Sequence, residues 1–355
     1  MIERIEKLFK FLKTDEAAVI TSPENRYYFL GFKSSAGVLV VTDEKAYFLI
    51  DFRYYEKASK EISGAEVILC ESLYTQLAEI LKNHNIIRVL PETEFVTLSG
   101  AERLKKGLSD FEIVLKNDLS SYISKMRAIK TKTEIEFITR AQNITDKTFD
   151  YILNMIKAGV SEKEIALSME FFMRKEGSDG IAFDIIAVSG KNSSLPHGVP
   201  TDKKIEIGDF LTMDFGAKWN GYCSDMTRTV AIGDITEKQK KVYNTVLLAQ
   251  KEALKAIRPQ VPCKEIDKIA RDIINDAGFE GCFGHGLGHS LGLEIHESPA
   301  CNTRDDTPLE AGMLMTVEPG IYIENEFGVR IEDMVVVTEN GCMNLTNSPK
   351  ELIIL

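Results

Sequence analysis

GHGLGHSLGLEIHESP, residues 284–299, holds three of the five histidines in this 355-residue chain. A fourth histidine lies in another glycine-flanked segment, SLPHG at residues 194–198. Carboxylates stand in three further segments: MDFGAKWNGYCSDMTRT at 213–229, TVEPG at 316–320 and GVRIED at 328–333. Imidazoles and carboxylates are common metal ligands. Each segment is a weak signal alone, but together they indicate a metal site.

The spacing of His285 and His289 is that of two ligands on one helical turn, but this segment is not expected to be a helix. Glycines at 284, 286 and 288 disfavour one. The zinc-protease helix also needs a glutamate directly after its first histidine, where this chain has a glycine. No cysteine is placed for a structural zinc site. We therefore exclude the zinc-protease helix.

Asp214 and Asp225 lie in two strand-like runs that are joined through Asn220-Gly221, a strong hairpin signal. The loop is either this dipeptide or the four residues 218–221, and both registers place the two aspartates on one face. Like charges that face each other in a partly buried site resist joint ionisation unless a cation lies between them. The alternative is that one aspartate caps the turn and the other is solvated.

Glu318 and Glu332 are embedded in the apolar runs GMLMTVEPG and VRIEDMVVV, which we interpret as interior strands. A buried glutamate needs a partner. Arg330 is near Glu332 on the same strand face, so a buried ion pair is the alternative explanation for that residue. The sequence offers Glu318 no such partner.

The candidate set therefore contains four carboxylates and one or two imidazoles, more negative charge than one divalent ion requires. Two ions roughly 3.5–4 Å apart could share these ligands and supply a nucleophile at neutral pH. Oxygen ligands with one imidazole favour Mn²⁺ and are compatible with Co²⁺, Fe²⁺ and Zn²⁺. The residues predict two divalent metal ions, with Mn²⁺ preferred.

These segments resemble a known family, the metallopeptidases of the pita-bread fold, which includes methionine aminopeptidase, aminopeptidase P and prolidase. The resemblance is close to the branch that cleaves Xaa-Pro bonds. It covers most of the chain from about Lys130 onward, and it rests on SGKNSSLPHG, the Asp214 to Asp225 spacing, GHGLGHSLGLEIHE, TVEPGIYI and GVRIED. The early segments SPENRYYFLGF and AYFLIDFRYYEKA are similar to the N-terminal domain that this branch carries.

The resemblance also implies roles for individual residues. The five metal ligands would be Asp214, Asp225, His289, Glu318 and Glu332. Glu318 would in addition shuttle a proton from water to the leaving nitrogen. His197 and His296 would contact the substrate and stabilise the tetrahedral intermediate. His285 would line the pocket for proline, and Arg330 would contact substrate from its place beside the metal-bound Glu332.

The fold that the resemblance implies is α+β. A C-terminal pita-bread domain with a curved antiparallel sheet, residues 126–355, follows a smaller α/β N-terminal domain, residues 1–125. The alternation of strand-like and helical runs before residue 119 agrees with α/β order, and the polar stretch at 119–132 indicates the boundary. In the second domain, capping boxes predict helix starts at Ser161 and Thr236.

Composition excludes several classes of function. The formal charge of −11 argues against nucleic acid as a partner. No apolar run approaches the ~18 residues of a membrane span, and the N-terminus has the pattern of an amphipathic helix rather than a signal peptide. The six cysteines are scattered without metal or disulfide spacing, which predicts reduced thiols and a cytoplasmic protein.

The predicted activity is hydrolysis of the bond between an N-terminal residue and a following proline. The substrate is a proline-containing dipeptide or a longer peptide, and the sequence leaves both open. The resemblance also implies a homodimer. Two alternatives share the fold: a metal-free amidinohydrolase like creatinase, and a non-catalytic binding protein. The complete set of ligand-type residues disfavours both.

Overall fold

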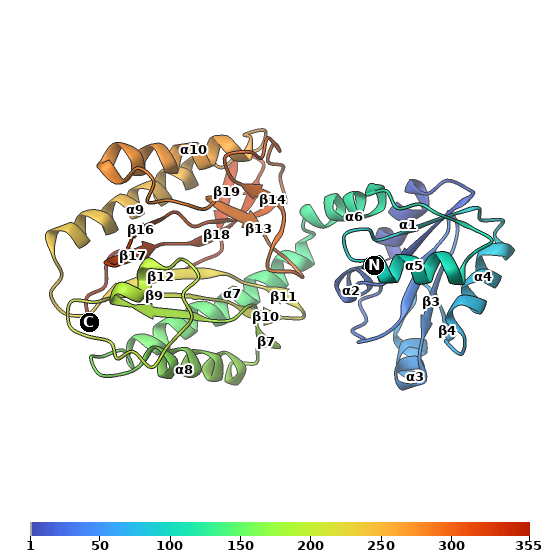
Figure 1. The fold of residues 1–355 in the computed structure, drawn as a ribbon, viewed down its shortest axis with the longest axis horizontal. Coiled ribbons are helices and arrows are strands. Elements are labelled where there is room, and N and C mark those ends of the chain that lie inside the picture. Colours follow the sequence, from blue (N-terminus) through green and yellow to red (C-terminus); the bar gives the residue numbers. More distant parts are fainter. Residues whose placement is uncertain (1) are drawn as a thin grey trace. The chain divides into compact units, whose positions relative to one another are not determined.

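The computed structural model describes residues 2–355, which form two compact units (Figure 1). The first unit ends at Met126 and the second runs from Arg127 to Leu355. Most of the polar stretch that the sequence marks as a boundary lies in a helix, α6 (Asp118–Ala128), which spans this division. Among residues 2–355, no helix combines the length and the apolar character that crossing a membrane requires.

The first unit is a mixed sheet with helices between its strands, in the predicted α/β order. The strand order is β4-β3-β2-β1-β5-β6, with β1–β5, β3–β4 and β5–β6 parallel. The strands are β1 (Glu16–Ile20), β2 (Val38–Val41), β3 (Ala46–Ile50), β4 (Glu66–Leu69), β5 (Arg88–Pro91) and β6 (Glu112–Ile113). The helices before α6 are α1 (Ile2–Phe11), α2 (Pro23–Leu30), α3 (Phe52–Glu61), α4 (Leu73–Asn83) and α5 (Leu98–Gly107).

The second unit pairs its strands in antiparallel ladders, as predicted. Its first half contains α7 (Lys132–Leu153), α8 (Glu162–Lys175), β7 (Gly180–Ile181), β8 (Ile186–Ser189), the short turn η1 (Gly190–Ser194), β9 (Phe210–Phe215), β10 (Ala217–Trp219), β11 (Tyr222–Cys223) and β12 (Met226–Ala231). Its second half contains α9 (Glu237–Ala256), α10 (Cys263–Ile274), the turn η2 (Asn275–Phe279), β13 (Gly288–Ser290), β14 (Glu297–Cys301), β15 (Leu314–Val317), β16 (Gly320–Ile323), β17 (Phe327–Arg330), β18 (Asp333–Thr338) and β19 (Gly341–Asn344).

Two helix pairs enclose the strands of this unit (Figure 1). Helices α7 and α8 bury Phe149 and Met169 against β8 and β9, while α9 and α10 bury Val242 and Ile266 against β15, β17 and β18. The strands of the two halves meet where Thr229 of β12 accepts a hydrogen bond from the amide of Arg330 on β17. Each helix pair thus covers one set of strands, and the strands face each other at the centre.

The predicted helix starts are present. Ser161 and Thr236 each form a capping box, in which the hydroxyl accepts from the third residue of the helix and that residue's side chain reaches back. A third box, Thr131 with Glu134, begins α7 and was not predicted.

Candidate metal centre and its cavity

The hairpin that carries the two aspartates forms with the shorter of the two loops considered. Trp219 pairs with Tyr222, which leaves Asn220-Gly221 as a two-residue turn with φ of 48° and 81°. The same register continues into β9 and β12, where Asp214 pairs with Thr227. Asp225 has the strand parity of Thr227, so both carboxylates lie on one face and line one cavity.

The two glutamates lie in breaks between strands, which corrects the expectation that each is inside a strand. Val317 pairs with Asp333 and Gly320 with Arg330, so one register runs through the gap and sets Glu318 opposite Glu332. Within the gap their amides bond elsewhere: Glu318 N–H donates to Leu287 and Glu332 N–H to Thr227. These neighbouring segments interrupt the ladder and let both side chains face the cavity.

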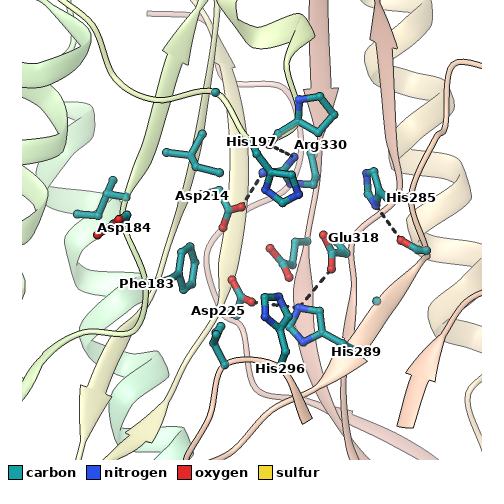
Figure 2. Close-up of a pocket in the computed structure, with 18 of the residues that line it drawn as sticks. Phe183, Asp184, His197, Asp214, Asp225, His285, His289, His296, Glu318 and Arg330 are labelled. Atoms are coloured by element: carbon teal, nitrogen blue, oxygen red, sulfur yellow. Dashed lines mark hydrogen bonds and ion pairs between the residues drawn. The ribbon is translucent and has the colours of Figure 1, made fainter. Parts of the chain in front are cut away.

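His289 lies on β13, not on a helix, in agreement with the sequence. Its Nδ1 is 3.1 Å from the carbonyl oxygen of Ser290, which can only accept, so Nδ1 carries the proton. Its Nε2 then has a free lone pair, and this atom lies 3.6 Å from Asp225 Oδ2 and 3.5 Å from Glu318 Oε1. A backbone carbonyl that fixes the tautomer in this way is typical of metal-binding histidines. Figure 2 shows these side chains converging from separate segments of the chain.

Several carboxylate oxygens at this centre lack the hydrogen-bond partners that buried polar atoms usually have. Among residues 2–355, three of their buried oxygens accept no hydrogen bond: Asp214 Oδ1, Asp225 Oδ1 and Glu332 Oε1. Burial and the neighbouring carboxylates raise the pKa of Asp225 and of Glu332 well above their usual range. Burial also raises the pKa of Glu318 to about 8. A group of crowded carboxylates with free lone pairs has the character of a cation-binding site.

The donor set fits divalent metal. Asp225, His289 and Glu332 each offer one ligand atom, and these three atoms lie within 4.8 Å of one another. Burial lowers the pKa of His289 to about 4, so the ring is neutral and can coordinate. Glu318 lies against the same imidazole nitrogen. Asp214 adds a fourth carboxylate to the cavity wall.

Arg330 pairs with Asp214 rather than with Glu332. Its Nη2 is 2.6 Å from Asp214 Oδ2, while Glu332 Oε2 accepts from the hydroxyl of Thr227 at 2.8 Å. The ion pair considered from sequence is therefore wrong, because Thr227 of the neighbouring strand takes the place beside Glu332. Thr227 also accepts from Arg330 Nε at 3.0 Å, which links the two carboxylates through one arginine.

The remaining predicted residues line the same cavity, which has a volume of about 670 Å³. His197 and His296 are exposed to it, and the His296 ring lies 4.5 Å from the His289 ring, centroid to centroid. His285 is largely buried, and burial lowers its pKa to about 4. The structure thus brings together every residue of the predicted site: His197, Asp214, Asp225, His285, His289, His296, Glu318, Arg330 and Glu332.

Sequence reasoning missed Tyr322, which connects two residues of the site. Arg330 Nη1 donates to the Tyr322 hydroxyl at 2.7 Å, and this hydroxyl lies 2.9 Å from His285 Nε2. His285 Nδ1 faces the carbonyl oxygen of Gly286, so Nε2 accepts and the tyrosine donates. The sequence held a signal, since Tyr322 follows directly in TVEPGIYI. Apolar lining residues were missed as well: Phe183, Ile185, Val199 and Ile295.

A cavity whose wall combines crowded carboxylates, an imidazole with a free lone pair and further histidines is typical of a metal-dependent hydrolase. Comparison with known proteins gives the family. Residues 136–339 match the model of metallopeptidase family M24, and residues 2–129 match the creatinase/prolidase N-terminal domain. The chain belongs to metallopeptidase family M24 and therefore works with divalent metal ions. The family and the fold class predicted from the sequence are both confirmed.

Individual relatives cover the whole chain. It is 40% identical to a Xaa-Pro dipeptidase of Pyrococcus furiosus, over 99% of this chain and 100% of that protein. A solved Xaa-Pro dipeptidase from Bacillus anthracis is 43% identical, with a TM-score of 0.94 over 100% of this chain and 99% of that one. An X-Pro aminopeptidase from Thermotoga maritima is 37% identical, with a TM-score of 0.92 over 99% and 100%.

Tyr322→Phe is expected to lower kcat/KM of this peptidase about tenfold, because Arg330 loses an acceptor and His285 loses its donor. The matched control is Tyr243→Phe, which also removes a buried hydroxyl, one that donates to the carbonyl oxygen of Lys350 at 3.0 Å outside the cavity. The measurements are kcat/KM from steady-state kinetics and the midpoint of thermal unfolding for both variants. Equal losses of activity in the two variants would contradict a role for Tyr322 in the site.

Proposed function

We propose that this protein is a Xaa-Pro dipeptidase that works with two divalent metal ions. Activity on Xaa-Pro bonds is the function predicted from the sequence, and the dipeptidase and prolidase relatives confirm it at the level of a Xaa-Pro peptidase. The metal-free amidinohydrolase and the binding protein are not favoured. Dipeptides are proposed as the substrates because two relatives that are 40% and 43% identical are named dipeptidases, while the X-Pro aminopeptidase is 37% identical.

The observation that carries the proposal is the set of buried carboxylate oxygens without hydrogen-bond partners among residues 2–355. We assign the metal ligands to Asp214, Asp225, His289, Glu318 and Glu332. When bound, the ions would polarise the scissile carbonyl and lower the pKa of a water molecule. Mn²⁺ is the ion proposed, because four carboxylates and one imidazole make a hard, oxygen-rich set.

The other side chains of the cavity have roles in moving protons and stabilising charge. Glu318, whose carboxylate lies 3.5 Å from His289 Nε2, is the group proposed to take a proton from water and pass it to the leaving nitrogen. The proline nitrogen must receive a proton as the bond breaks, because any amide nitrogen leaves as an amine and not as an amide anion. The exposed rings of His197 and His296 are the donors proposed for the developing oxyanion. His285 is assigned to the wall of the proline pocket.

Arg330 acts through its neighbours as well as on the substrate. Its guanidinium is buried and bonds Asp214, Thr227 and Tyr322, and it also donates to the carbonyl oxygen of Pro196 at 3.1 Å. It therefore fixes the orientation of one proposed ligand and of the segment that precedes His197. A guanidinium suits this place because it offers several donors in a rigid plane.

Two further features belong to the proposal. All six cysteines are free thiols in the structure, which supports a reducing compartment, and we propose the cytoplasm. We also propose a homodimer, on the resemblance to the family.

The first test is hydrolysis of Ala-Pro beside Ala-Pro-Ala and Ala-Ala. Chelator-treated protein should cleave none of them, and added Mn²⁺ or Co²⁺ should raise Ala-Pro hydrolysis about a hundredfold or more. Ala-Ala, which lacks the imide nitrogen, is the control for specificity. Preference for Ala-Pro-Ala would replace the dipeptidase by an aminopeptidase. Failure of every metal to restore cleavage of any of these peptides would overturn the proposed function.

A further inference from the structure

We propose that Glu162 is a positioning residue for His197, and that its carboxylate holds both ends of the loop that carries this histidine. The inference rests on the proposed function, because it concerns a residue assigned to that reaction. Glu162 lies outside the cavity and far from the candidate metal ligands in sequence. It is nonetheless fully buried, and buried glutamates are rare unless their oxygens are satisfied.

The carboxylate of Glu162 accepts hydrogen bonds from three residues of one loop. Oε1 accepts from the amide and the hydroxyl of Ser189, at 2.7 and 3.0 Å. Oε2 accepts from the amide and the hydroxyl of Thr201, at 3.0 and 2.7 Å. The side-chain amide of Asn192 lies 3.1 Å from Oε1 and 3.2 Å from Oε2. One oxygen therefore holds the start of the loop and the other holds its end.

The segment between Ser189 and Thr201 is the one that presents His197 to the cavity. Ser189 is the last residue of β8, and the chain then passes through η1 and SLPHG. The His197 ring is exposed, so its position depends on the backbone that carries it. Within the loop, Gly198 N–H donates to the carbonyl oxygen of Leu195 at 3.0 Å, which closes a turn around the histidine.

The helix that bears Glu162 is rigidly joined to the same loop. Glu162 is the first residue of α8, directly after the capping box of Ser161. Its own amide donates to the carbonyl oxygen of Lys203, and the next amide of the helix donates to that of Thr201, both at 3.2 Å. The N-terminal end of a helix also favours a negative charge. The carboxylate is therefore fixed to a well-packed element, and it can fix the loop in turn.

A carboxylate is the group that this position requires. Every contact to Glu162 comes from a donor, and two of the donors are backbone amides, which cannot turn around to accept. In Glu162→Gln the shape is kept, but one oxygen becomes an NH₂ group that faces Ser189 N–H or Thr201 N–H. One end of the loop then loses its acceptor, and a buried amide is left unsatisfied.

The test is a double-mutant cycle on kcat/KM for Ala-Pro in the Mn²⁺-loaded enzyme. Glu162→Gln is expected to lower kcat/KM about ten- to a hundredfold in the wild-type background, because a displaced donor no longer meets the developing charge. In a His197→Ala background the same substitution should cost no more than about twofold. If the double variant instead loses the product of the two single-variant factors in kcat/KM, Glu162 does not act through His197, and the inference is overturned.

Asp146→Asn is the matched control. Asp146 Oδ1 of α7 also accepts from a loop, through the amide and the hydroxyl of Ser348 at 3.0 and 2.7 Å, but that loop does not line the cavity. Its substitution should lower kcat/KM by the same small factor in both backgrounds. If Glu162→Gln does not fold, Thr201→Val removes one donor to the same carboxylate and should show the same coupling at a smaller size.

Hydrogen exchange gives a second readout that does not depend on activity. Glu162→Gln should speed exchange in residues 189–201 while leaving the strands β15 and β18 protected. Unchanged exchange in this segment would overturn the inference even if activity fell. Wild-type enzyme that cleaves no Xaa-Pro peptide would instead overturn the proposed function, so the two failures are distinguishable.

Discussion

Asp225→Asn is expected to reduce kcat/KM for Ala-Pro by about a thousandfold or more, with a loss of bound metal. Asp225 is buried, and its Oδ2 faces the free nitrogen of His289. An amide of the same shape keeps an oxygen but removes the negative charge that would hold a divalent ion. The measurement is steady-state kinetics together with metal content after dialysis. Full activity with full metal content would contradict the assignment of Asp225 as a ligand.

The same substitution should have the opposite effect on the stability of the metal-free protein. Asp225 is surrounded by carboxylates, and burial and their charge raise its pKa well above the usual range. Replacing it relieves repulsion, so the midpoint of thermal unfolding of metal-free Asp225→Asn should rise by about 2–4 °C over that of metal-free wild type. With Mn²⁺ present the order should reverse, because the wild type binds the ions and gains stability.

Asp333→Asn is the control that separates this effect from the loss of any buried aspartate. Asp333 is equally buried, but it pairs with Arg228 at 2.7 Å and its pKa is lowered by Arg228 and Lys350 despite burial. Its substitution should therefore destabilise the protein with or without metal. If the unfolding midpoints of the two variants shift in the same direction in the metal-free protein, the carboxylates around Asp225 do not destabilise the fold.

The features that the sequence predicted well depend on local geometry. Asn220-Gly221 fixes a two-residue turn, and the turn fixes the register that places Asp214 and Asp225 on one face. The glycines around His285 and His289 correctly excluded a helix. Helix starts followed from side chains only three residues apart.

The features that the sequence did not predict depend on contacts between distant segments. Arg330 bonds Asp214 from another strand, although Glu332 is its nearer neighbour in sequence. Glu318 and Glu332 lie outside regular strands because their backbone amides donate hydrogen bonds to the carbonyl oxygens of Leu287 and Thr227. These hydrogen-bond partners are determined by tertiary packing, which leaves no periodic signal in the sequence.

Removal of metal is expected to make the stability of the second unit fall as pH rises from 6.5 to 8. Glu318 has a pKa of about 8 in the folded protein, against an ordinary value of 4.5. Between these values the folded state holds a proton that the unfolded state has released, so its contribution to stability is lost as pH rises. Asp225 and Glu332, whose pKa values are also raised, act in the same direction.

The histidines oppose this trend only at lower pH. The pKa of His285 and of His289 is lowered to about 4, so their contribution to stability is complete above the ordinary value of 6.5 and is lost as pH falls. Above 6.5 these two histidines therefore no longer affect how the stability changes with pH. Over the 1.5 pH units to pH 8, Glu318 by itself should cost the metal-free protein about 2 kcal/mol.

Metal-loaded protein should not show this loss, because ligands that hold a cation have already released their protons. At a free metal concentration of 1,000 times Kd, binding adds about 4 kcal/mol to the stability of the native state. The measurement is differential scanning calorimetry from pH 6.5 to 8, with and without Mn²⁺. The transition of interest is the one whose midpoint shifts when Mn²⁺ is added. Glu318→Gln should flatten the pH dependence of the metal-free protein. A metal-free transition that stays level or rises over this range would contradict the crowded, protonated cluster from which the proposed metal centre is inferred.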